Sequence, residues 1–131
     1  MAHIAENIKE HVSLRPYNTF GVEATARYFL NLEHSRQLME LMENHPGWMD
    51  SYYMLGGGSN VLFTEDYPGL ILLNRIFGKK VIEDSEEEVL LQVGAGENWH
   101  KLVRYTVEQG WGGLENLSLI PGTVGAAPIQ N

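Results

Sequence analysis

Cysteine is absent from the 131-residue sequence, which excludes disulfide bonds, zinc–thiolate centres and thiol nucleophiles. Basic residues are also few: 9 Lys and Arg stand against 17 Asp and Glu, for a formal net charge of −8. No basic stripe is present that would bind nucleic acid or an anionic lipid surface. The longest dense apolar stretches are short, such as Leu70–Leu73, and residues 1–10 lack the apolar core of a signal peptide. We therefore expect a cytoplasmic protein with neither nucleic acid nor membrane as a partner.

The remaining composition is that of a folded protein. Hydrophobic residues make up 44% and charged residues 20% of the chain, which is typical of a globular domain. Much of the acidity is local, in the run Glu83–Glu88, which we expect at the tip of a hairpin. The five histidines show no metal-ligand spacing, so we expect no metal site.

Hydrophobic periodicity and turn residues predict an α+β (mixed α/β) fold. Strands are expected at Ala26–Leu32, Tyr52–Leu55, Val61–Phe63, Leu70–Asn74, Val81–Glu83 and Val89–Val93, the last two as a hairpin. Helices are expected at Ser35–Asn44, with Leu38, Leu41 and Met42 on its apolar face, and at Asn98–Gln109, with Trp99, Leu102, Val103 and Val107. The strand–helix–strand order over Ala26–Leu55 favours a parallel pair. The chain up to about His11 is expected to be loose.

The first candidate site is the loop Gly56-Gly57-Gly58-Ser59-Asn60, which follows a predicted strand. Glycines allow successive backbone N–H groups to face a ligand, and Ser and Asn side chains add donors, so the loop suits a phosphate. It matches neither a Walker loop nor G-x-G-x-x-G. The alternative is a tight turn joining two strands.

The second candidate is Ser118–Pro128, which is rich in small residues and poor in charge. It would let a large flat group lie against the backbone, and Pro121 is expected to open a short helix. The alternative is a small-residue turn packed on the core. A ligand with a pyrophosphate and a ring system would use both loops. Among weaker candidates, His100 is expected to face solvent, and Tyr17 and Trp111 could stack on a ring or simply pack.

Four motifs in order then carry a resemblance. They are Asn18-Thr19-Phe20-Gly21, Gly56-Gly57-Gly58-Ser59-Asn60-Val61-Leu62, Val93-Gly94-Ala95-Gly96-Glu97-Asn98-Trp99-His100, and the segment from Gly113 to Asn131. After about His11 the chain closely resembles the N-terminal part of the UDP-N-acetylenolpyruvoylglucosamine reductase family (UDP-N-acetylmuramate dehydrogenases, MurB), flavoenzymes of bacterial peptidoglycan synthesis.

The resemblance implies part of an FAD-binding domain of the vanillyl-alcohol oxidase and p-cresol methylhydroxylase type. It implies a first subdomain at about residues 12–80 and the start of a second at about 81–131. The cofactor-binding residues it implies are Leu55, Gly56, Gly57, Gly58, Ser59, Asn60, Val61, Pro121, Gly122, Thr123, Gly125, Ala126, Ala127 and Ile129. The first loop would hold the pyrophosphate, and the second segment would lie along the flavin. With no Cys, and no His in either segment, we expect non-covalent FAD.

The implied activity is the NADPH-dependent reduction of the enolpyruvyl group of a UDP-sugar, through bound FAD. The family's catalytic arginine, serine and glutamate are expected beyond Asn131, with the substrate domain, so no catalytic residue is assigned and this piece alone is expected to be inactive. The alternatives are a non-catalytic FAD- or dinucleotide-binding module, or another oxidase on the same fold. We expect a monomer for the complete protein, and association of the piece through exposed sheet edges.

Overall fold

The chain forms two compact units, residues 1–75 and 76–131. The computed structural model describes residues 4–130. We call these units the N-terminal unit and the C-terminal unit. The family resemblance places the division at about residue 80. That the two units are subdomains of an FAD-binding domain stays a prediction.

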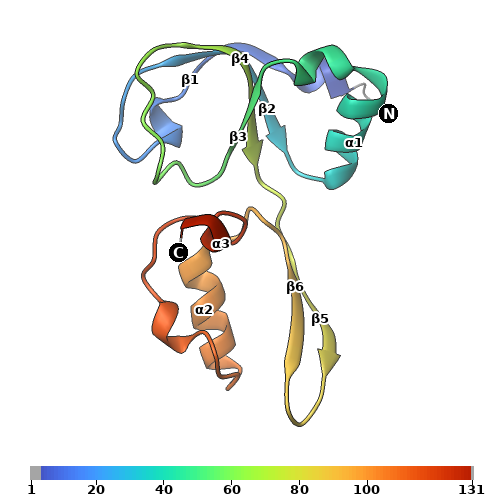
Figure 1. Cartoon of the computed structure of the whole chain (residues 1–131), viewed down its shortest axis with the longest axis vertical. Helices are drawn as coiled ribbons and strands as arrows, with labels where there is room; N and C mark the ends of the chain where they lie inside the picture. The colour runs from blue at the N-terminus through green and yellow to red at the C-terminus, as the bar shows by residue number, and fades with distance from the viewer. Residues whose placement is uncertain (1–3, 131) are drawn as a thin grey trace. The chain divides into compact units, whose positions relative to one another are not determined.

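A four-stranded sheet forms the frame of the N-terminal unit (Figure 1). Its strands are β1 Lys9–Ser13, β2 Thr25–Leu32, β3 Tyr52–Leu55 and β4 Tyr67–Asn74, and its α-helix is α1 Ser35–Asn44. Short 3₁₀ helices occupy Ile4–Asn7, Arg15–Tyr17 and Pro46–Met49. The strand order is β1-β2-β4-β3, with β1 antiparallel to β2 and the other neighbours parallel.

The central strand β4 is apolar on both sides, and this explains its position. Ile71 and Leu73 enter one buried cluster, which includes Phe29, and Leu70 and Leu72 enter the other. Strands buried on both faces read as continuous hydrophobic runs. The run at residues 70–73 therefore marks the middle of the sheet.

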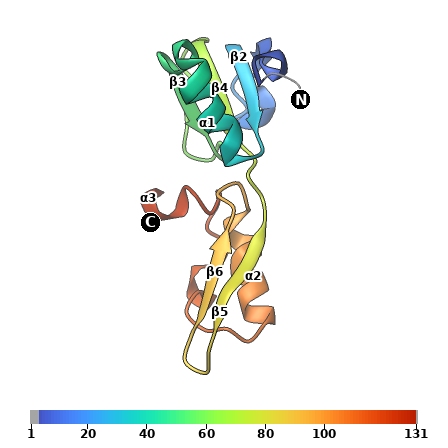
Figure 2. The same cartoon turned by 90° about the vertical axis from the view of Figure 1, so that its right-hand side faces the viewer.

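Helix α1 covers one face of this sheet (Figure 2). Leu41 is fully buried there with Leu30 and Leu70, and Leu38 packs against them. The predicted helix bounds are confirmed. The prediction that Met42 lies on the apolar face is wrong. Met42 is 57% exposed, because the helix contacts the sheet through Leu38 and Leu41 instead.

Three sequence expectations are corrected in the N-terminal unit. The segment before His11 is not loose where it is described: Ile4 is buried in a 3₁₀ helix and β1 pairs with β2. Residues 61–63 form no strand, since Phe63 and Val61 pack into the core without a neighbouring strand to pair with. The parallel strands β2 and β3 are not neighbours, because β4 lies between them. Residues 1–3 of the expected loose segment lie outside the described residues.

The C-terminal unit contains a hairpin and helices (Figure 1). Its elements are β5 Lys79–Asp84, β6 Val89–Val93, α2 Trp99–Glu108, a 3₁₀ helix at Glu115–Leu117 and α3 Ala127–Gln130. The hairpin β5–β6 is antiparallel, and its tip carries the exposed Glu86–Glu88, as the sequence predicts.

Helix α2 begins and ends where capping residues place it. The Asn98 side chain accepts a 2.9 Å hydrogen bond from the Lys101 N–H, and Gly110 has φ +78° just after the helix. The helix buries Leu102, Val103 and Thr106. Val107, expected on this face, is 51% exposed.

Among residues 4–130, no helix combines the length and apolarity needed to cross a membrane.

Candidate functional site

The glycine loop lies at the carboxyl end of a parallel strand. Strand β3 ends at the buried Leu55, and Gly56–Asn60 follows directly. In open α/β sheets, ligands bind at such strand ends. The loop and its continuation to residue 66 join β3 to β4, so the alternative of a tight turn between two strands is wrong.

Gly58 is closely restricted by its surroundings. Its φ is +72°, a left-handed conformation that favours glycine. A Cβ at Gly58 would collide with the carbonyl oxygen of Tyr17 and lie 2.8 Å from Cα of Asn18. The loop therefore packs backbone against backbone on the 17–18 segment.

The segment Asn18–Gly21 binds the glycine loop through hydrogen bonds from Thr19. Thr19 donates from its N–H to the Gly58 carbonyl oxygen at 3.0 Å and from Oγ1 to the same oxygen at 3.3 Å. The buried Asn18 side chain donates to the carbonyl oxygens of Leu14 and Val22, at 2.8 and 3.1 Å, and accepts from the Val22 N–H at 3.0 Å. The supporting segment is therefore itself fixed at both ends.

The backbone donors of the loop are unused. Among the residues that the structure describes, no protein acceptor takes a hydrogen bond from the N–H groups of residues 56–61. Gly57 and Asn60 are exposed, and Gly56 and Ser59 are half-buried. Consecutive free N–H groups beside a close-packed glycine suit an anion such as a phosphate.

The second segment runs antiparallel to the chain that precedes α2. Thr123 forms an isolated bridge with Asn98, and the Trp99 N–H donates to the Gly122 carbonyl oxygen at 3.1 Å. The N–H of Val124 donates to the carbonyl oxygen of Glu97 at 2.8 Å. Backbone pairing thus fixes the path of residues 122–124.

Gly125 docks this segment on Ala95. The Gly125 N–H donates to the Ala95 carbonyl oxygen at 3.0 Å, and a Cβ at Gly125 would lie 2.8 Å from the Ala95 Cβ. The N–H groups of Ala126 and Ala127 both donate to the Thr123 carbonyl oxygen, at 3.2 and 3.1 Å. Donors 124–127 are therefore already taken, unlike those of the glycine loop.

The expected helix at Pro121 is wrong. Pro121 lies in a loop, and α3 begins at Ala127, with Pro128 in its first turn. Gly122, at φ +111°, is the reason: it turns the chain into the pairing with Asn98 instead of a helix. Ile129, another predicted site residue, is 88% exposed on α3.

Two side chains that sequence reasoning missed make long-range contacts in the C-terminal unit: His100 contacts the second segment, and Glu97 contacts the start of the hairpin. His100, expected to face solvent, is half-buried, and its Nδ1 accepts a 3.0 Å hydrogen bond from the Leu119 N–H. Glu97 accepts a 2.6 Å hydrogen bond from the Gly78 N–H, and its other oxygen lies 3.9 Å from the Lys79 ammonium. The spacing of either residue offers no signal for these contacts, because both partners lie 19 or 18 residues away in the sequence.

Tyr17 and Trp111, the weaker stacking candidates, contact protein rings. Tyr17 packs on Phe29 with ring centroids 5.0 Å apart, and Trp111 meets Tyr105 edge-on at 5.8 Å. Both therefore have the packing role that the sequence left as an alternative.

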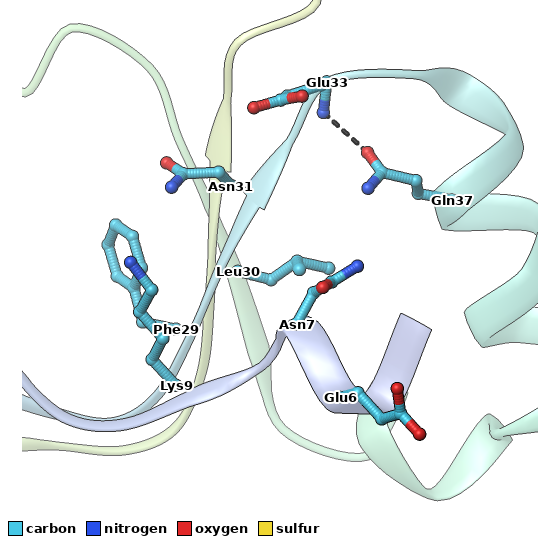
Figure 3. Close-up of a pocket in the computed structure, with 8 residues that line it drawn as sticks. All are labelled: Glu6, Asn7, Lys9, Phe29, Leu30, Asn31, Glu33 and Gln37. Carbon is cyan, nitrogen blue, oxygen red and sulfur yellow. Dashed lines mark hydrogen bonds between the residues drawn. The ribbon is translucent and has the colours of Figure 1, made fainter. Parts of the chain in front are cut away.

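A surface cavity of about 380 Å³ lies elsewhere in the N-terminal unit (Figure 3). It is lined by Glu6, Asn7, Lys9, Phe29, Leu30, Asn31, Glu33 and Gln37. The Gln37 side chain accepts from the Glu33 N–H at 2.7 Å, so its oxygen already serves the start of α1. No predicted site residue lines this cavity. Within residues 4–130, no group of three or more His, Asp or Glu side chains could hold a metal ion.

The chain is similar to known proteins along most of its length. A family described as FAD binding domain matches residues 31–131. The UDP-N-acetylenolpyruvoylglucosamine reductase of Burkholderia multivorans is 49% identical over 118 residues, which cover 90% of this chain and 34% of that protein. The reductase of the same name from Chromobacterium violaceum is 47% identical over 121 residues, covering 92% and 35%.

The fold agrees with a solved structure. The crystal structure of UDP-N-acetylenolpyruvylglucosamine reductase (MurB) from Thermus caldophilus superposes with a TM-score of 0.66 at 29% identity, over 92% of this chain and 41% of that one. The chain spans about a third of the length of the curated relatives it matches. Because the family match covers residues 31–131, most of the chain, this protein belongs to the FAD-binding domain family.

Proposed function

We propose that this chain is the FAD-binding part of an NADPH-dependent reductase that converts UDP-N-acetylglucosamine enolpyruvate to UDP-N-acetylmuramate in peptidoglycan synthesis. The names of its relatives support the reaction, and the family match supports the cofactor. The observation that carries the proposal is the row of N–H groups at residues 56–61 that have no protein acceptor among the described residues.

The glycine loop fits the pyrophosphate of FAD. A pyrophosphate needs several donors in one place, and backbone N–H groups supply them without a side chain that must be ordered. The restricted Gly58 gives the loop a defined shape before any ligand binds. We assign the pyrophosphate to Gly56–Asn60, flanked by Leu55 and Val61.

The second segment fits the flat part of the cofactor. The N–H groups of residues 124–127 are occupied within the protein, so these four residues offer van der Waals contact and carbonyl oxygens instead of backbone donors. Ala126 and Ala127 add no polar side-chain atom. We assign Pro121, Gly122, Thr123 and Gly125 to this contact, together with Ala126, Ala127 and Ile129.

FAD supplies hydride transfer when it is bound, and the protein supplies binding and orientation. We assign the residues of the two segments to that second role. We place the catalytic groups and the UDP-sugar site in chain beyond Asn131. The proposed compartment is the cytoplasm, which the lack of cysteine suits, and the proposed state of the complete protein is monomeric.

The test is a titration of the chain with FAD, followed by flavin absorbance and fluorescence. Saturable binding is expected. Gly57→Val should raise the dissociation constant about tenfold or more, since crowding the loop removes at least one hydrogen bond to a charged group. Gly57 is not among the glycines with a positive φ, so valine there needs no left-handed backbone conformation.

Gly47→Val is the matched control. Gly47 is an exposed glycine of ordinary φ with open space around the position of a Cβ, and it lies outside the loop. This variant should bind FAD as the parent chain does. A folded chain that shows no saturable binding, or a Gly57→Val variant with the parent's affinity, contradicts the proposal.

A further inference from the structure

We infer that Thr19 is a positioning residue for the phosphate-binding loop: through the Gly58 carbonyl it sets the direction of the Ser59 N–H. The inference about the peptide plane stands on the structure alone. Its use in binding rests on the proposed function, since a phosphate oxygen is the acceptor we assign to that N–H.

Two donors of one residue converge on one carbonyl oxygen. The N–H of Thr19 lies 3.0 Å and its Oγ1 lies 3.3 Å from the oxygen of Gly58. The two residues are 39 positions apart in the sequence. Two hydrogen bonds to one carbonyl oxygen restrict the rotation of its peptide plane more than a single hydrogen bond does.

A fixed carbonyl also fixes the next amide. The described chain has no cis peptide bond, and in a trans peptide the N–H points opposite to the C=O of the same plane. The Gly58 oxygen faces Thr19, so the Ser59 N–H faces away from it. Among the described residues nothing in the protein accepts that N–H, and it is therefore a donor aimed before any ligand arrives.

Thr19 can hold the loop because it is itself held. It is the second residue of a turn that the Gly21 N–H closes on the Asn18 carbonyl oxygen at 3.2 Å. The buried Asn18 side chain braces this turn from the other side. The Gly58 backbone also packs directly on Asn18, which leaves little room for its peptide to flip.

Three substitutions separate the two donors. Thr19→Ser keeps both, Thr19→Val removes only the hydroxyl, and Thr19→Pro removes both. Proline suits the second position of a turn, and Asn18 has the extended conformation, φ −136° and ψ 142°, that precedes proline. The turn should therefore survive in Thr19→Pro while the Gly58 carbonyl loses both partners.

The first measurement is ¹⁵N relaxation of the Ser59 amide without ligand. The order parameter should stay at about 0.85 in the parent chain and in Thr19→Ser, and fall to about 0.6 in Thr19→Pro. The amide of Leu70, which donates to Ser51 within the same unit, serves as the internal reference. An unchanged Ser59 order parameter in Thr19→Pro overturns the inference.

The second measurement compares FAD with riboflavin, which lacks the pyrophosphate. Thr19→Pro should weaken FAD binding about tenfold, Thr19→Val less, and Thr19→Ser hardly at all. Riboflavin affinity should not change across the series. An equal loss for both ligands would overturn the positioning role in favour of a general loss of structure. A parent chain that binds no FAD, but loses Ser59 order in Thr19→Pro, would contradict the proposed function and leave the role of Thr19 supported.

Discussion

The backbone N–H of Leu119 donates a 3.0 Å hydrogen bond to Nδ1 of His100, so a ring on α2 holds the start of the second segment. Leu119 has φ +64°, which is uncommon for a residue other than glycine, and its side chain is 80% exposed. Burial of the Leu119 side chain therefore does not hold the residue in this conformation. The neighbouring Trp99 donates from its indole N–H to the Leu117 carbonyl oxygen at 2.9 Å and secures the same stretch.

Replacing His100, whose Nδ1 accepts the hydrogen bond from Leu119, should increase the mobility of residues 117–121. His100→Leu removes Nδ1 and keeps an apolar side chain of moderate size, so the Leu119 amide loses its partner and its backbone can leave the unfavourable φ. We expect hydrogen exchange at Leu119 to accelerate severalfold. Lys101→Ala, at an exposed position on the same helix, is the control. Equal protection of the Leu119 amide in His100→Leu and the parent would show that the bond does not hold the segment.

Gly58→Ala should cost about 1–3 kcal/mol of stability, because alanine must adopt φ +72° and its Cβ meets the Tyr17 carbonyl. Gly57→Ala, in the same loop without a positive φ, should change stability by less than about 0.5 kcal/mol. Urea unfolding of the two variants measures the difference. Similar midpoints would mean that the loop moves off the 17–18 segment at little cost.

Gly125 and Ala95 offer a reciprocal test of the second segment. Gly125→Ala should destabilise the C-terminal unit, since the new Cβ lies 2.8 Å from the Cβ of Ala95. Adding Ala95→Gly removes that Cβ and should restore part of the loss. A double-mutant cycle on thermal unfolding measures the coupling, which we expect to be about 0.5–3 kcal/mol. Simple additivity of the two changes would argue against this close packing.

Protonation of the Glu115 carboxylate should weaken the turn at Gly113 that this carboxylate stabilises. Its carboxylate accepts a 2.5 Å hydrogen bond from the Gly113 N–H, and bonds from the backbone at Glu115 and at Gly113 lower its pKa from the usual 4.5. A lowered pKa means that the ionised form is the one the fold favours. The contribution is therefore present above the ordinary pKa and is lost as the pH falls through the lowered value.

The Gly113 amide chemical shift, followed from neutral pH downward, should report this titration with a midpoint below 4.5. Glu115→Gln should abolish the titration. A midpoint at or above the ordinary value would show that the side chain leaves the turn in solution.

The sequence predicts an element correctly where a local pattern determines it. The bounds of α1 and β3 and the cap of α2 follow from periodicity, a glycine triplet and Asn98. Hydrophobic periodicity does not predict β1, because Lys9–Ser13 is polar and exposed except at Val12. That strand forms because it pairs with the edge of β2, from Lys9 opposite Phe29 to Ser13 opposite Thr25, and a local pattern does not reveal such a partner.

For the candidate site, the sequence located the two segments but not what holds them. Glycine clusters are visible in a sequence because the residue type itself is the signal. Thr19 and His100 hold the two segments through hydrogen bonds to backbone atoms distant in the chain. A backbone acceptor can belong to any residue type, so no spacing or composition marks such partners in advance.

The unpartnered amides at residues 56–61 also determine how a ligand would couple to folding. They contribute no bond within the described fold, so a ligand that takes them breaks no intramolecular bond and displaces only water. A ligand that binds the native chain and not the unfolded one stabilises the native state by an amount that depends on its concentration relative to its dissociation constant. For a ligand held at about a hundred times its dissociation constant, the gain is about 2.7 kcal/mol. Saturation of the loop should therefore raise the melting temperature of the chain, and the size of that rise would measure affinity without any optical signal from the ligand.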